Sequence, residues 1–251
     1  MSDSSISKPR EEFTEDEHRI WAALYDNLID RVMEHACEDY LRGFELLHIP
    51  KDRVPSLAEL EAEIYPRTGW RLERTSVRYT NAMDWYPKFA QRIFLITDYL
   101  RSWEEFHWTH EPDMWHDIFG HLPFMTLKHY AELEEMFAPA FLAAWTDEQR
   151  ENVKRLAWFS TEFGLIRENG KVKIFGAGLI SGADELDNAM AGRIPRMEFT
   201  IENVIQYDKA VYTQNEVLFV FDSIEALKAE LSRYFTPLLA GEEPPVKSNR
   251  G

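Results

Sequence analysis

The chain has 251 residues, of which 45% are hydrophobic and 14% aromatic, and its formal net charge is −16 at pH 7. This length and apolar content suffice for one large core, and the negative charge argues against nucleic acid or an anionic membrane as a partner, because it would repel phosphates. Cys37 is the single cysteine, which excludes an internal disulfide and a cysteine-rich zinc site.

The N-terminal ten residues are polar and do not form the apolar centre of a signal peptide, and no run approaches the ~20 apolar residues that span a bilayer. We therefore expect a cytoplasmic protein. Residues 1–11 are Ser-rich and charged, which predicts a mobile tail.

The first third of the chain is predicted to be mainly helical. Apolar residues recur at helical spacing from Thr14 to Pro50, which indicates one long amphipathic helix. A capping-box pattern at residues 56–59 predicts a second helix, ending near Pro66 and Gly69. Residues 71–79 are a predicted strand, a short helix containing Trp85 follows, and residues 92–96 fit either a strand or a helix turn.

The most unusual stretch is residues 109–123, where two imidazoles and several carboxylates stand among large apolar residues. Pro112 suits the first turn of a short helix, and Gly120 and Pro123 indicate its end. Residues five apart on a regular helix differ by about 140°, so His116 and His121 would not share a face. We therefore expect the chain to leave helical geometry at Gly120, so that His121 can turn back toward His116.

Two neutral imidazoles suit zinc, iron, copper or nickel, and such a site needs at least one more ligand. On spacing alone, two histidines five apart are more often core or surface residues than metal ligands. The neighbouring carboxylates of Glu111, Asp113 and Asp117 favour a metal site, because they could orient the imidazole rings.

The second half is predicted to alternate helices with short strands. Residues 126–145 should form a helix kinked at Pro139. A second capping box at 146–149 begins a helix that runs to Phe163. Glu162 lies in its otherwise apolar end, where a buried carboxylate needs a cation, a hydrogen-bond donor or water.

Asn169-Gly170 between two apolar segments predicts a hairpin with a type I′ turn. Further elements are expected as a helix over 181–191, a strand over 217–221 and a capped helix ending near Tyr234. The pattern predicts a mostly α (α+β) fold with short β-ribbons, in a single domain over residues 12–235 followed by a disordered tail over 236–251.

Two blocks of the sequence resemble the tetrahydropterin-dependent aromatic amino acid hydroxylase family, especially bacterial phenylalanine 4-hydroxylases. The first is Glu111-Pro112-Asp113 with His116-Asp117, Phe119-Gly120-His121 and Pro123. The second is Trp158-Phe159-Ser160-Thr161-Glu162-Phe163-Gly164-Leu165, followed by Phe175-Gly176-Ala177-Gly178-Leu179-Ile180-Ser181 and Glu185-Leu186. The resemblance implies a compact catalytic domain and Fe(II) held by His116, His121 and Glu162.

The resemblance also implies where the small molecules bind. Arg101 would pair with the carboxylate of the amino acid, steadied by Asp113 and Thr109, since guanidinium holds a carboxylate through two parallel hydrogen bonds. The remaining implied residues fall into three groups: the aromatic pocket of Pro112, Trp158 and Phe163; its wall of Gly178 and Ser181; and the cofactor side of Trp85, Asp117 and Ala157.

By this resemblance the protein is a non-haem iron monooxygenase that hydroxylates the ring of a free aromatic L-amino acid with O2 and a reduced pterin. Phenylalanine to tyrosine is the first expectation, in a monomer or small homo-oligomer. The cofactor side departs from the family pattern, with Val77-Arg78-Tyr79 in place of a glycine-containing turn, Ala157 in place of tyrosine and Trp85 in place of phenylalanine.

These departures leave open an altered substrate, such as tryptophan or a modified phenylalanine, or an altered cosubstrate. From the ligands alone, a zinc-dependent hydrolase also remains, although no adjacent His-Glu-x-x-His glutamate is present. A non-catalytic helical protein that keeps the fold is the third reading.

Overall fold

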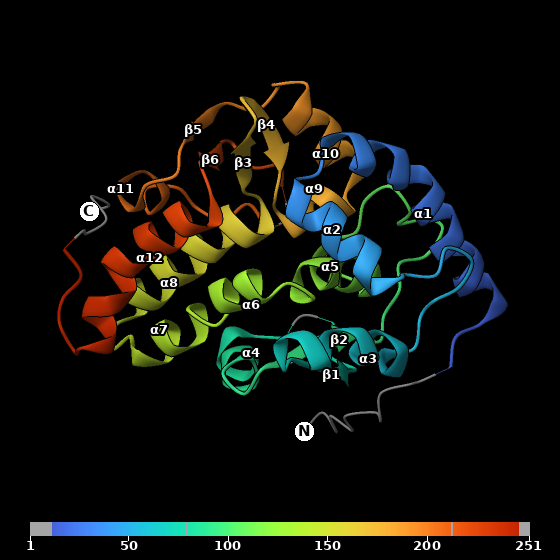
Figure 1. Cartoon of the computed structure of the whole chain (residues 1–251), viewed down its shortest axis with the longest axis horizontal. Coiled ribbons are helices and arrows are strands. Elements are labelled where there is room, and N and C mark those ends of the chain that lie inside the picture. The colour runs from blue at the N-terminus through green and yellow to red at the C-terminus, as the bar shows by residue number, and fades with distance from the viewer. Residues whose placement is uncertain (1–11, 79, 212, 246–251) are drawn as a thin grey trace, which may run out of the picture.

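The computed structural model describes residues 12–78, 80–211 and 213–245. Helices dominate, as the sequence predicts, and the two small sheets lie at opposite ends of the view in Figure 1, with α5 and α6 between them. The predicted tail over 1–11 and residues 246–251 lie outside the described part.

The helices of the first half are α1 (Glu15–His35), α2 (Glu38–Leu47), α3 (Leu57–Thr68), α4 (Ala82–Phe89), the π-helix η1 (His116–His121), α5 (Leu122–Met125) and α6 (Lys128–Glu134). Those of the second half are α7 (Phe137–Ala143), α8 (Asp147–Ala157), the π-helix η2 (Trp158–Glu162), α9 (Ala177–Ser181), α10 (Ala183–Met190), α11 (Ile201–Val204) and α12 (Ile224–Leu239). The capping boxes predicted at Ser56 and Thr146 are both present, and Gly69 ends α3 in the left-handed conformation.

The single long helix expected between Thr14 and Pro50 was wrong, because the chain divides into α1 and α2. Ala36 adopts an extended conformation and forms an isolated bridge with Ile174, and the Cys37 N–H donates to the Ile174 carbonyl at 2.9 Å. The backbone at the break thus pairs with a distant strand end, which helical periodicity cannot report.

The helix expected over 126–145 also divides, and the break lies before Pro139 rather than at it. Proline removes one helical N–H, and its ring collides with the carbonyl four residues earlier, here that of Glu135. Helix α6 ends at Glu134 and α7 begins at Phe137, so the interruption falls at that carbonyl. Helix α12 runs on to Leu239 instead of ending near Tyr234, with Pro237 inside it.

The strands are β1 (Arg71–Thr75), β2 (Ile93–Thr97), β3 (Leu165–Glu168), β4 (Lys171–Ile174), β5 (Arg196–Glu198) and β6 (Leu218–Phe221). Strands β1 and β2 pair in parallel, which resolves residues 92–96 as a strand. Strand β1 is shorter than the predicted 71–79, and Tyr79 is outside the described residues.

The second sheet has the order β4-β3-β6-β5. The predicted hairpin is confirmed as β3 and β4, and both turn residues have positive φ, 51° at Asn169 and 75° at Gly170. Strand β6 lies parallel to β3 and β5, and the sequence reasoning had no strand at β5.

One apolar core connects these layers, and Trp21, Trp70 and Trp115 are fully buried in it. Trp115 stacks on Phe119, with ring centroids 4.1 Å apart, and because Phe119 lies in η1, this contact packs η1 directly against the core. None of the helices in the described part of the chain combines the length and apolar character needed to span a bilayer.

Candidate metal centre and its two cavities

The two histidines lie at the ends of η1, which is continuous with α-helical residues 114–115 before it and α5 after it. The expectation that the chain leaves helical geometry at Gly120 was therefore wrong. In a π-helix the hydrogen bond joins residues five apart, so a five-residue spacing corresponds to about one turn. The π-turn aligns the two imidazoles without ending the helix.

Pro123 explains why the helix widens here. It cannot donate to the carbonyl of Phe119, and its ring would collide with that carbonyl in an α-helix. The Phe119 carbonyl instead accepts a hydrogen bond from the Tyr40 hydroxyl at 2.7 Å. Position 123 falls in the first turn of α5, where a proline N–H is not needed, so the helix resumes instead of ending.

The third residue of the cluster, Glu162, ends a second π-helix, η2, which continues α8. The Phe163 N–H donates to the Trp158 carbonyl, five residues earlier, at 2.9 Å. The Ser160 hydroxyl donates to the Leu156 carbonyl at 2.5 Å, a hydrogen bond back to the preceding helical turn.

These segments bring three donor groups together. His116 Nε2 lies 3.1 Å from His121 Nε2 and 3.4 Å from a Glu162 oxygen, and His121 Nε2 lies 3.1 Å from the other Glu162 oxygen. Ligands about 2.1 Å from one ion and at right angles to each other would be about 3 Å apart. The geometry therefore fits one metal ion, and the two-imidazole, one-carboxylate set matches the facial arrangement of non-haem iron oxygenases.

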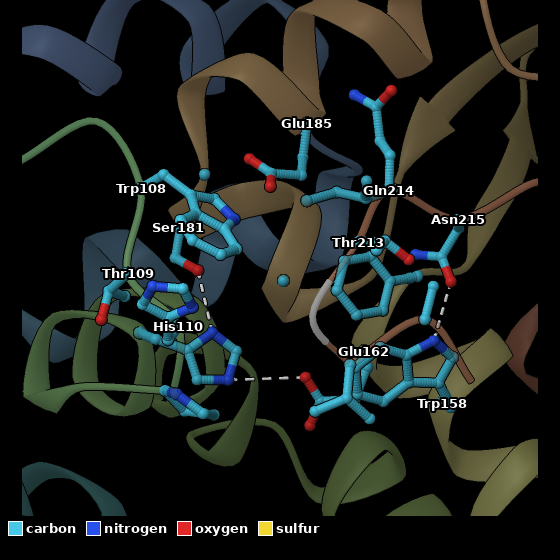
Figure 2. A pocket seen from close by; sticks show the side chains of 18 of the residues that line it. Trp108, Thr109, His110, Trp158, Glu162, Ser181, Glu185, Thr213, Gln214 and Asn215 are labelled. Carbon is cyan, nitrogen blue, oxygen red and sulfur yellow. Dashed lines mark hydrogen bonds and ion pairs between the residues drawn. The ribbon is translucent and has the colours of Figure 1, made fainter. Parts of the chain in front are cut away.

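Ser181 fixes the orientation of the His116 ring. Its hydroxyl donates to the Ala177 carbonyl at 2.9 Å, so its oxygen accepts from the Nδ1–H of His116, also at 2.9 Å. In the neutral His116 ring the lone pair is then on Nε2, where a metal would bind, whereas the protonated ring donates from Nε2 to Glu162. Figure 2 shows Ser181 and Glu162 joined to the same imidazole by dashed lines. The expectation that a neighbouring carboxylate orients this ring was wrong.

The three carboxylates named for that role have other contacts. Asp113 accepts from the backbone N–H of His116 at 3.1 Å, Asp117 accepts from the Thr97 N–H at 2.8 Å, and Glu111 pairs with Arg78 at 3.5 Å. The His121 ring packs on Phe94, with centroids 5.3 Å apart, and its Nδ1 has no hydrogen-bond partner among the described residues.

Burial and mutual attraction shift the ionisation of the cluster in opposite directions. Burial by itself raises the pKa of Glu162, but attraction to His121 and hydrogen bonds from both imidazoles hold that pKa below its ordinary value. Burial lowers the pKa of His116, whereas Glu162 more than compensates and raises it. Burial raises the pKa of Asp117 to about 7.

The first of two cavities at the cluster contains Arg101, which is 6% exposed. Its guanidinium donates to both Asp113 oxygens, Nε to Oδ2 at 2.8 Å and Nη2 to Oδ1 at 2.9 Å, as the sequence reasoning expected. Burial by itself raises the pKa of Asp113, but the charge of Arg101 and the hydrogen bonds that it donates lower that pKa by a larger amount. The net shift of the pKa is therefore downward. Thr109 lines the same cavity and donates to the Glu111 carbonyl at 3.1 Å.

The walls of this first cavity are the remaining residues expected near the substrate: Pro112, Trp158, Phe163, Gly178 and Ser181. The rings of Trp158 and Phe163 lie 4.6 Å apart, and the Trp158 indole donates to the Asn215 side chain at 2.8 Å. Figure 2 shows Trp158 and Asn215 on one side of this cavity, with Trp108 and Thr109 on the other side of the view. Sequence reasoning missed Asn215, because no motif surrounds it.

The second cavity shares His116 and Glu162 with the first, is also lined by His121, and extends toward β1 and α4. The cofactor-side residues Trp85, Asp117 and Ala157 all line it. Trp85 packs edge-on against Phe94, with centroids 5.2 Å apart, so its ring orientation is set by the core. Two lysines that the sequence reasoning did not select, Lys154 and Lys209, also line this cavity.

Comparisons with known proteins agree with this geometry. A protein-family model described as biopterin-dependent aromatic amino acid hydroxylase matches residues 4–240. The phenylalanine-4-hydroxylase of Vibrio cholerae is 30% identical over 217 residues, which cover 86% of this chain and 74% of that protein. The tyrosine 3-monooxygenase of Canis lupus familiaris is 31% identical over 230 residues, which cover 90% of this chain and 46% of that protein.

Among solved structures, the phenylalanine hydroxylase of Chromobacterium violaceum with bound Fe(III) has a TM-score of 0.87 at 27% identity, over 97% of this chain and 91% of that one. The same enzyme with iron(III) and oxidised 7,8-dihydrobiopterin has a TM-score of 0.85 at 27% identity, over 97% and 89% of the two chains.

Proposed function

The chain belongs to the biopterin-dependent aromatic amino acid hydroxylase family, and we propose that it hydroxylates the ring of a free aromatic L-amino acid, with phenylalanine to tyrosine as the first reaction to test. It has the family's iron-binding site of two histidines and one glutamate, His116, His121 and Glu162. Membership of this family is the reason that we prefer a hydroxylase to the two other interpretations, a zinc hydrolase and a non-catalytic protein, which the ligands alone left open.

The observation that carries this proposal is a buried arginine in the same cavity as two of the metal-binding side chains, His116 and Glu162. Asp113 occupies Nε–H and one Nη2–H of Arg101, and the Phe106 carbonyl lies 3.5 Å from Nη1. A guanidinium has five N–H groups, so further donors remain for a carboxylate of the substrate. Asp113 holds the arginine in one orientation, which reduces the entropy lost on binding.

The aromatic side chains of the first cavity would hold the ring of the substrate. Trp158 is fixed by its hydrogen bond to Asn215, and Phe163 lies against it, so both present preformed apolar faces. Arg101 at one end and these rings at the other select a molecule that has both a carboxylate and an aromatic group. The side chains position the substrate and exclude water, and they supply no acid or base to it.

Bound iron supplies the activation of O2, which the protein side chains cannot provide. His116, His121 and Glu162 would hold the ion from one side, which leaves other positions for O2 and water. We place the reduced pterin in the second cavity, against Trp85, with Asp117 and Ala157 beside it. The support is that all three ligands line this cavity, and two of them, His116 and Glu162, also line the first cavity.

The test is product identification by mass spectrometry. The purified protein, loaded with Fe(II), is incubated aerobically with tetrahydrobiopterin and separately with phenylalanine, tyrosine or tryptophan. Relatives named for phenylalanine and for tyrosine match at similar identity, so the product decides the substrate. Tyrosine formed from phenylalanine supports the proposal. If only tryptophan gave a hydroxylated product, the assignment of phenylalanine as the substrate would be wrong. If none of the three amino acids were hydroxylated, the proposed reaction would be wrong.

A further inference from the structure

The second cavity contains two lysines that the binding of a neutral pterin does not require. The side chains of Lys154 and Lys209 both line it, and they share one carboxylate partner, Glu151. Lys209 Nζ lies 2.5 Å from one oxygen of Glu151, and Lys154 contacts the other oxygen. Two ammonium groups on one carboxylate leave one positive charge uncompensated at this place.

The lysines reach the cavity from two different elements. Residues three apart on a helix are neighbours on its surface, so Glu151, Lys154 and Ala157 form a row on α8, which η2 continues to the metal-binding Glu162. Lys209 comes from the segment after α11 and is largely buried, with 16% of its side chain exposed. Burial lowers the pKa of Lys209, Lys154 lowers it further, and Glu151 opposes both.

The other charged groups of this cavity do not cancel the lysines. Asp117 and Glu162 are part of the metal centre or adjacent to it. Arg78, the third cation of the lining, already has two carboxylate partners, Glu105 at 3.6 Å and Glu111 at 3.5 Å. The chain has a net charge of −16, so two partly buried lysines facing one cavity are not the result of a generally basic surface.

We propose that the second cavity binds a reduced pterin whose side chain carries an anionic group, which Lys154 and Lys209 recognise. The ring system lies against Trp85, and Ala157, the smallest side chain of the row, leaves space for a substituent to pass toward the lysines. The anionic group is a carboxylate, as in the glutamyl tail of a reduced folate, or a phosphate ester. This inference rests on the proposed placement of the pterin.

The test measures binding rather than turnover, by anaerobic equilibrium dialysis of dihydropterins with the iron-loaded protein at low and moderate salt. Dihydroneopterin and its phosphate ester form a matched pair that differs only in the phosphate group, and dihydrobiopterin and dihydrofolate form a second comparison. We expect the phosphate ester or dihydrofolate to bind at least about fivefold more tightly than its uncharged counterpart, with the difference shrinking as salt rises. Which anion shows the preference distinguishes the two sources.

Substitution of the lysines and substitution of Glu151 should change the preference for the anionic pterin in opposite directions. Lys154→Gln with Lys209→Gln should remove the preference, whereas Glu151→Gln should increase it, because both lysines lose their competing carboxylate. A merely structural role for the lysines would not strengthen binding in Glu151→Gln. Lys228→Gln removes a lysine that pairs with Glu132 and does not line either cavity, so it should leave both affinities unchanged.

Thermal melting of each variant confirms folding, and the single Lys209→Gln change replaces the double variant if the latter unfolds. Equal or tighter binding of the uncharged pterins by the unchanged protein would overturn the inference, and so would a preference that survives loss of the lysines. Either result would leave the proposed hydroxylation with tetrahydrobiopterin intact, because that proposal does not depend on an anionic side chain. Failure of all four dihydropterins to bind would overturn the placement of the pterin, and with it the inference.

Discussion

The hydroxyl of Ser181 should control how tightly the protein holds its metal, although it is not itself a ligand. It accepts the Nδ1–H of His116 at 2.9 Å and donates to the Ala177 carbonyl at 2.9 Å. Ser181→Ala removes the acceptor and leaves the Nδ1–H of a partly buried imidazole without its protein partner. The ring then loses the contact that fixes both its rotation and the nitrogen that carries the lone pair.

The size of the effect follows from the contacts of the two imidazoles. His121 is held by packing on Phe94 and has no hydrogen bond at its Nδ1 among the described residues, so Ser181 provides the hydrogen bond that orients a ligand ring here. Loss of such an outer contact typically weakens metal binding about 10- to 100-fold. This corresponds to about 1.4 to 2.7 kcal/mol, in the range expected for one unmade buried hydrogen bond.

The assay is anaerobic titration of the metal-free protein with Fe(II) against a competing chelator. Ser232→Ala is the matched control, because its hydroxyl also donates to the carbonyl four residues earlier, that of Lys228 in α12, and does not line either cavity. We expect a 10- to 100-fold rise in Kd for Ser181→Ala only. Equal affinities in Ser181→Ala and the unchanged protein would refute the assignment of Ser181 as the residue that orients His116.

Three further substitutions test other parts of the site and the core. Arg101→Ala should raise KM for the amino acid about tenfold or more and keep the iron, since charge-assisted hydrogen bonds to the carboxylate are lost; loss of iron would make Arg101 structural. Gly178→Ala should raise the same KM, because its Cβ would lie 2.6 Å from Cζ of Phe163 and displace that ring; unchanged kinetics would mean that Phe163 does not contact substrate. Burial raises the pKa of Glu134 from 4.5 to about 8, so the folded protein retains a proton that the unfolded chain releases. Stability should therefore fall between these pH values by up to about 1.4 kcal/mol per pH unit, and Glu134→Gln should remove this component in urea titrations across pH; parallel profiles would contradict it.

The sequence predicted local structure well wherever one short signal determines it. Asn169-Gly170 predicts its hairpin because both residues tolerate positive φ, and Ser56 and Thr146 begin helices because their side chains can accept backbone N–H groups. The break at Ala36 was missed because its cause is a bridge to Ile174, far along the chain. Periodicity reports which face of a helix is apolar and does not report what the backbone meets elsewhere.

The same distinction holds for the site. The pairing of Arg101 with Asp113 was expected from the family resemblance, whereas composition alone favoured a solvated arginine in a loop. Asn215 and Lys209 were missed because each joins the site from a segment without a motif. Lys154 could have been found, because it lies three residues from Glu151 and from Ala157 and therefore shares their helix face.

The metal centre depends on two wide helical turns that no helical-periodicity argument anticipated. An α-helix would direct residues five apart about 140° away from each other, whereas the π-turn of η1 directs both imidazoles to one point. Such a turn needs room beside it, and Gly120 provides that room, because a Cβ there would lie 2.8 Å from the Ala177 carbonyl. That carbonyl is the acceptor of the Ser181 hydroxyl, so the close packing of η1 on α9 also positions the group that orients His116. The proline that widens the helix and the glycine that lets it pack therefore serve the same end, since together they convert a five-residue spacing into a pair of ligands.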